Sequence, residues 1–193
     1  MSAPRRTDRF LSPAAFALAV ACAAPRVASL PKPGWVDQGT GAFKEADGDE
    51  YHGISVVRGI HNHVLAEATG RDQAKSELYK TVVVHICVLG RDYRSMTVGD
   101  VPDPDKYNEC PPLFGSTPDS MATARALTKE LMAAFVFAGT WDDPADRSTK
   151  TYYQIGRSAV DDVLIRCVGD NPKLRDFIRS QGPKAFEEEL TKR

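Results

Sequence analysis

The stretch from Ala66 to Leu89, AEATGRDQAKSELYKTVVVHICVL, is the one from which the predicted fold can be built. In its first half, small or apolar residues recur at every fourth position: Ala66, Gly70, Ala74 and Leu78. This spacing places side chains on neighbouring turns of one helical face. We therefore predict an amphipathic helix whose narrow face allows another element to lie close.

The second half of the stretch, TVVVHICVL from Thr81 to Leu89, has a different composition. β-Branched residues dominate it, and they favour extended backbone. Alternate residues would lie on opposite faces of a strand, and both faces would be largely apolar. The pattern therefore predicts a central strand that ends at Gly90.

Length and composition indicate an ordinary globular domain. The 193 residues are enough for one hydrophobic core, and 42% of them are hydrophobic while 26% are charged. The 25 basic side chains are balanced by 26 acidic ones. Because the chain lacks an excess of basic charge, we do not expect nucleic acid to be its partner.

The N-terminus has the features of a secretory signal. Arg5, Arg6 and Arg9 precede the apolar run FLSPAAFALAVACAA, which ends in small residues. The run is shorter than the ~20 apolar residues that span a bilayer, and no other segment comes near that length. We predict a signal peptide over residues 1–21 and no transmembrane helix.

The end of this signal, Ala19-Val20-Ala21-Cys22, resembles the lipobox of bacterial lipoproteins. The resemblance implies that Cys22 receives acyl chains such as palmitate and becomes the new N-terminus. Residues 22–33 would then form a Pro- and Ala-rich tether, and residues 34–193 a single α+β domain. The alternative is an ordinary secretory signal in which Cys22 has no role.

With Cys22 lipidated, three cysteines remain in an oxidising compartment: Cys87, Cys110 and Cys167. An odd number permits at most one intramolecular disulfide. We expect Cys87 and Cys167 to be small core residues, and the sequence leaves open which cysteines pair.

The other predicted elements complete the α+β pattern. Residues 37–49 are expected to form a loop and residues 54–58 a strand, so that the chain begins strand, helix, strand. A surface excursion follows from Gly90 to Pro118, and a helix starts at Thr117-Pro118. Residues 135–141 and 152–157 alternate as an antiparallel hairpin would.

Three C-terminal helices are then predicted from their start and stop signals. A capping box of Ser158 and Asp161 opens the first, and Gly169 ends it. Asn171-Pro172 caps the second, and Gly182-Pro183 separates it from the last. The predicted architecture is a small, mostly antiparallel sheet with helices packed on it.

The chain resembles the bacterial outer-membrane lipoprotein family named after a twenty-kilodalton antigen, which has relatives among flagellar-assembly proteins. The resemblance rests on Pro33-Gly34-Trp35-Val36, on Ala74-x-x-Glu77-Leu78 leading into Val82–Val88, and on Trp141 followed by Tyr152-Tyr153. It implies a small α+β domain held at the envelope, facing the periplasm, that binds or assembles with other envelope proteins.

Catalytic and metal-binding patterns are weak in this sequence. A zinc site is conceivable for His52, His61, His63 and His85, but His85 falls on the predicted strand, and no cysteine or carboxylate is spaced to complete a tetrahedron. We interpret the others as solvated histidines near a helix start. An acidic loop contains Asp142, Asp143 and Asp146, whose oxygens are of the kind that binds calcium, but the spacing and terminal Glu of an EF-hand are absent. We interpret these aspartates as turn residues. No nucleophile motif or phosphate loop occurs, so we expect neither an enzyme nor a cofactor.

The predicted hairpin is the best candidate for contact with a partner. Tyr and Trp are frequent in binding hot spots, and Tyr152 and Trp141 are the residues that we expect to meet a partner. A soluble periplasmic hydrolase or a metal-binding protein remains the alternative to a binding protein anchored by lipid.

Overall fold

The computed structural model describes residues 31–98 and 118–191. All of them belong to one compact unit that begins at Pro31. The predicted signal peptide, Cys22, most of the tether and Cys110 lie outside the described residues. Within these two described ranges, no helix combines the length and the apolar character that crossing a membrane requires.

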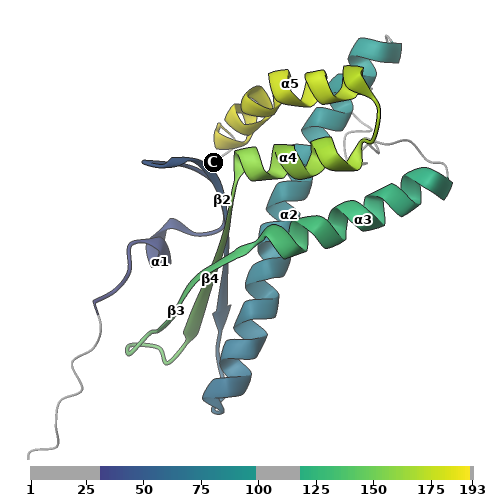
Figure 1. The fold of residues 1–193 in the computed structure, drawn as a ribbon. Coiled ribbons are helices and arrows are strands. Elements are labelled where there is room, and N and C mark those ends of the chain that lie inside the picture. Colours follow the sequence, from purple (N-terminus) through teal and green to yellow (C-terminus); the bar gives the residue numbers. More distant parts are fainter. Residues whose placement is uncertain (1–30, 99–117, 192–193) are drawn as a thin grey trace, which may run out of the picture. The chain divides into compact units, whose positions relative to one another are not determined.

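Four strands and five helices make up the described part of the chain (Figure 1). In chain order they are α1 (Trp35–Gln38), β1 (Gly41–Glu45), β2 (Gly48–Val57), α2 (His63–Val98), α3 (Pro118–Ala134), β3 (Val136–Asp142), β4 (Thr149–Gly156), α4 (Arg157–Cys167) and α5 (Pro172–Leu190). The strands form one antiparallel sheet in the order β1-β2-β4-β3. The predicted α+β class, with helices on a small antiparallel sheet, is confirmed.

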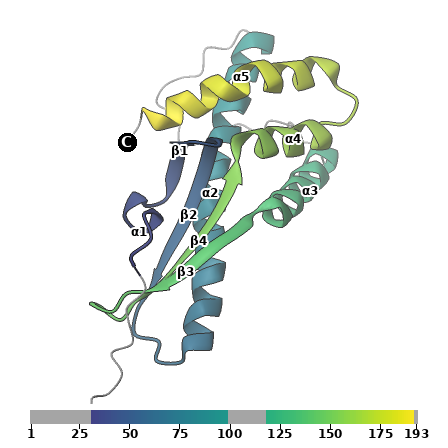
Figure 2. The same cartoon turned by 60° about the vertical axis from the view of Figure 1, so that its left-hand side comes forward.

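Helix α2 packs along one face of the sheet through its small-residue side. Figure 2 shows it running behind the strands, with α4 and α5 across its upper part. The predicted narrow face is buried: Ala66, Gly70, Ala74 and Leu78. Opposite them, Gly53 of β2 lies so close that a Cβ atom there would be 2.4 Å from the Ala74 carbonyl oxygen. The prediction that this helix lies close to its neighbour is thus confirmed.

The predicted strand from Thr81 to Leu89 is wrong, because these residues continue α2 to Val98. Buried residues follow the helical spacing across the supposed boundary, at Leu78, Val82, His85 and Leu89. A run that is apolar at nearly every position satisfies both a period of two and a period of 3.6. Burial against α4 and α5 outweighs the small helix penalty of β-branched residues.

Several boundaries also differ from the prediction. The expected loop over residues 37–49 contains the end of α1 and the whole of β1, so the chain starts with a β1–β2 hairpin. The expected excursion begins after Val98 instead of at Gly90, and residues 99–117 lie outside the described part. The predicted helix from Pro118 and the β3–β4 hairpin are confirmed.

The C-terminal signals are confirmed in part. Asn171 caps α5, accepting a hydrogen bond from the Leu174 amide at 3.1 Å, and Gly169 follows α4 with φ +59°. Gly182-Pro183 does not break the chain, since α5 runs on to Leu190. Gly182 is buried against α4, where a Cβ atom would lie 2.4 Å from an Asp161 oxygen, so this glycine permits a close helix contact.

Candidate functional site

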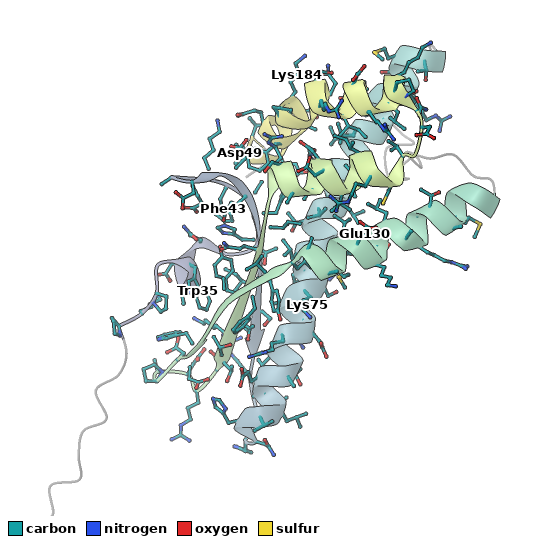
Figure 3. The ribbon with its side chains drawn as sticks, in the orientation of Figure 1. Trp35, Phe43, Asp49, Lys75, Glu130 and Lys184 are labelled. Carbon is teal, nitrogen blue, oxygen red and sulfur yellow. The ribbon has the colours of Figure 1, made fainter. Side chains whose placement is uncertain are left out.

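The face of the sheet opposite α2 carries an aromatic cluster. The Trp35 ring of α1 stacks on Tyr152 with a centroid distance of 5.3 Å, and His52 meets Tyr152 edge-on at 4.9 Å. Phe43 stacks on His52 at 4.3 Å. Figure 3 shows Trp35 and Phe43 on the side of the strands away from Lys75 of α2. The short helix α1 therefore covers part of this face of the sheet. Among the described residues, none of the longer helices covers it.

Tyr152 is buried in this cluster, with only 6% of its surface exposed. Burial raises the pKa of its phenol, and the nearby carboxylates of Glu50 and Glu45 raise it further. A partner would reach Tyr152 only by displacing Trp35. Tyr152 is thus placed in the packing of the sheet face, and Trp35 is the aromatic residue that lies over it, a role that the sequence analysis missed.

The histidines do not match their predicted setting as a group. His52 and His85 are buried, with 1% and 0% of their surfaces exposed, whereas His61 and His63 are exposed. The His52 Nε2 atom lies 3.3 Å from a Glu50 oxygen. Burial, together with the negative charge of Glu45 and Asp47, raises the pKa of Glu50. The prediction of a solvated histidine is therefore wrong for His52, and His85 lies in helix α2 instead of the predicted strand.

Trp141 remains partly exposed near the end of β3. The Lys150 ammonium of β4 lies 5.2 Å from its ring centroid, within the range of a cation–π contact. Lys150 also binds Asp143 at 3.3 Å, which holds the cation beside the turn. Of the two residues predicted to meet a partner, Trp141 is the one that the fold leaves accessible.

The outer edge of β3 is apolar, and no other strand of the described residues pairs with it. The strand is last in the sheet order, and its first residues are exposed: 56% for Val136 and 40% for Phe137. The Arg71 guanidinium of α2 lies 4.3 Å from the Phe137 ring centroid. An edge strand with free backbone groups can pair with another strand unless charge or proline blocks it. This edge and Trp141 together form the candidate binding surface.

The acidic loop after β3 shows the expected turn chemistry. Asp143 accepts from the Ala145 amide and Asp146 from the Ser148 amide, each at 2.9 Å. Asp142 accepts from the Thr149 hydroxyl at 2.7 Å and lies 3.0 Å from the His63 Nε2 atom. In the described part of the chain no three His, Cys, Asp or Glu side chains are grouped as metal ligands.

A buried ionic cluster joins the strands to the C-terminal helices, and the sequence analysis missed it. Asp161 accepts from Arg157 at 2.5 Å and lies 3.2 Å from the His85 Nε2 atom. Arg157 also donates to Asp49 at 3.1 Å. Asp161 does not cap α4 as predicted, since the cap is Gly156 and has no side-chain hydrogen bond. Instead of forming the predicted capping box with Ser158, Asp161 lies beside His85 of α2.

The two cysteines of the described residues differ. Cys87 in α2 is disulfide-bonded, so the expectation that it is a plain core residue is wrong. Cys167 at the end of α4 is a free thiol, half-buried against the core as expected. Burial, and then the charge of Glu130, raises the pKa of the Cys167 thiol and so keeps it protonated and unreactive.

No family model, no curated protein and no solved structure matches the chain. The resemblance to the outer-membrane lipoprotein family therefore stays a prediction, and the residues described above carry the functional argument alone.

Proposed function

We propose that this chain is a lipid-anchored protein of the bacterial cell envelope, at the outer membrane and facing the periplasm, that binds or assembles with other envelope proteins. The observation that carries the proposal is the order of features at the N-terminus: arginines, an apolar run, and Ala19-Val20-Ala21-Cys22. Acylated Cys22 is the membrane anchor in this proposal.

Two further features support the proposal. The disulfide at Cys87 suits an oxidising compartment such as the periplasm. Removal of residues 1–21 takes away three arginines and one aspartate, which leaves 22 basic against 25 acidic side chains, a net charge of −3. A mildly acidic domain gains little from an anionic membrane surface, so acyl chains at ~0.8 kcal/mol per buried methylene are the anchor.

The binding role rests on the β3–β4 hairpin. Its edge is open and apolar, and the partly exposed Trp141 lies near its end. Aromatic side chains beside an unpaired strand offer both apolar contact area and backbone hydrogen bonds to a partner. We assign the role of this domain to binding rather than to catalysis on this basis.

The test is the chemical state of the N-terminus. The full-length chain would be expressed in a bacterial host, and the intact mass and N-terminal peptide of the membrane fraction measured, with Cys22→Ser as the matched control. We expect an N-terminus at Cys22 that carries acyl mass, and loss of membrane attachment in the control. An unmodified Cys22 would overturn lipid anchoring and move the soluble periplasmic alternatives ahead.

A further inference from the structure

Strand β3 lacks most of the features that normally protect a sheet edge. Natural edge strands are blunted by charged side chains, by proline or by a covering element. The segment Val136–Trp141, VFAGTW, contains neither charge nor proline, and no other strand of the described residues pairs with its outer side. The one edge-blunting feature of β3 is a bulge between Phe137 and Gly139, and the residues from Gly139 to Asp142 pair with β4 in regular register beyond it.

The two ends of this edge carry opposite charge. At the start of β3, the Arg71 guanidinium lies over Phe137, and the Lys75 ammonium of the next helical turn lies 5.2 Å from the Tyr153 ring centroid. At the end of β3, Asp143 is paired with Lys150, whereas Asp142 lies on the α2 side of the sheet. On that side the edge therefore runs from the basic Arg71 and Lys75 to the acidic Asp142.

An edge of this kind complements itself in the antiparallel direction. When two identical strands pair about a two-fold axis, the start of each lies beside the end of the other. The bulge between Phe137 and Gly139 leaves Phe137 on the α2 side of the sheet and Trp141 on the Trp35 side, so in a pair centred on Gly139 these two aromatic residues lie on opposite faces of the joined sheet. Arg71 would then stand next to Asp142 of that copy, twice by symmetry.

Arg71 and Asp142 are accessible enough to form this additional contact. The side chains of Arg71 and Asp142 are 44% and 55% exposed. Arg71 uses one nitrogen on Glu67, and a guanidinium has five N–H donors. Asp142 contacts His63 on α2, so it lies on the same side of the sheet as Arg71. A two-fold axis perpendicular to the sheet keeps both residues on that side.

We propose that a second copy of this chain binds the β3 edge, so that two four-stranded sheets join antiparallel into one continuous sheet, with Arg71 of each copy paired to Asp142 of the other. The inference goes beyond the proposed function and does not depend on acylation of Cys22. It names the assembly partner as the chain itself.

Charge exchange between two tagged copies tests the symmetry of this contact. Two full-length copies with different C-terminal tags would be co-expressed, and co-purification measured in a whole-cell extract in mild detergent, so that localisation does not decide the result. Wild-type copies should co-purify. Arg71→Asp should lose at least tenfold with itself, and so should Asp142→Lys, because each homodimer contains two like-charge contacts.

The combination of the two variants decides the proposal. A copy with Arg71→Asp and a copy with Asp142→Lys form two opposite-charge contacts, so their co-purification should return to near the wild-type level. That recovery also shows that both variants fold. Failure of wild-type copies to co-purify, single variants that bind as wild type does, or loss without recovery in the mixed pair would each overturn the proposal.

An edge variant with a matched control gives a second measurement. Val136→Lys adds a charge to the open edge and should reduce co-purification at least tenfold. Val84→Lys makes the same substitution at a valine that is 45% exposed on α2, beyond the helical turns that carry Arg71 and Lys75, and should leave co-purification unchanged. Equal effects of the two variants would overturn the assignment of the interface to β3.

Discussion

Gly53 is the position where the contact between β2 and α2 is tightest. A Cβ atom built there would lie 2.4 Å from the Ala74 carbonyl oxygen, 2.5 Å from the Leu78 Cβ atom and 2.6 Å from the Leu78 amide nitrogen. Ordinary van der Waals contact begins at 3.4 Å. Two of the three obstacles are helix backbone, which cannot rotate away as a side chain can.

The substitution Gly53→Ala therefore requires α2 to move by about 1 Å from the strand, or the strand to bend. Overpacking of a well-packed core costs about 1–3 kcal/mol. We expect about 3 kcal/mol, because backbone is displaced and the same helix is buried along the rest of the sheet. For a domain of this size each 1 kcal/mol lowers Tm by about 2–4 °C, so the expected fall is about 6–12 °C.

Urea unfolding, followed by far-ultraviolet circular dichroism, measures the change in the free energy of unfolding. The control is Gly139→Ala, also in a strand, where the added Cβ atom would meet Trp35 at 3.8 Å, an ordinary contact. The control should change stability by less than about 0.5 kcal/mol. A loss below about 1 kcal/mol for Gly53→Ala would refute the claim that α2 and β2 meet without room for a methyl group.

Three further predictions concern buried or covalent groups. Burial raises the pKa of Tyr51, so the folded state keeps the phenol proton above pH ~10 while the unfolded state loses it, and this group should contribute a fall in stability of about 1.4 kcal/mol per pH unit there. Tyr51→Phe should reduce the slope by that amount in urea unfolding at alkaline pH, with the contribution of Tyr152 left in place, and at pH 7 should cost under about 1 kcal/mol, because the hydroxyl has no hydrogen-bond partner among the described residues. Asp161→Ala should lower the free energy of unfolding at pH 7 by about 3 kcal/mol, since it leaves buried His85 without its carboxylate and takes away one of the two carboxylates that Arg157 contacts; a loss under about 1 kcal/mol would contradict this. Non-reducing peptide mapping should show Cys87 linked to Cys110, the cysteine left once the free thiol of α4 and Cys22, the proposed lipid attachment site, are excluded, and a reduced Cys87 would contradict the disulfide.

Local signals predicted much of the fold correctly. The small-residue face of α2, the start of α3 at Pro118 and the cap at Asn171 all depend on residues within a few positions of one another. The β3–β4 hairpin has clear alternation because one face of β4 is buried against α2. Patterns of this kind are visible in one sequence because the physics that produces them is local.

The candidate site was predicted less well, because its contacts are long-range. Tyr152 and Trp141 were chosen as aromatic residues of one hairpin, but Trp35, more than a hundred residues away in sequence, covers Tyr152. Likewise His85 and Asp161 meet across α2 and α4. No spacing rule connects such residues, and an open sheet edge can be recognised only when the strand order is known.

The error over residues 81–89 and the open edge at β3 are linked through the number of strands. A strand over residues 81–89 would have been a fifth strand, and it was predicted to lie in the centre of the sheet. Because they extend α2 instead, the sheet of the described residues is built from two hairpins, and β2 and β4 take the two central places. Among those residues β3 has a partner strand on one side, and Val136 and Phe137 at its start are exposed. The surface proposed to join two copies therefore exists because a β-branched segment is buried as a helix.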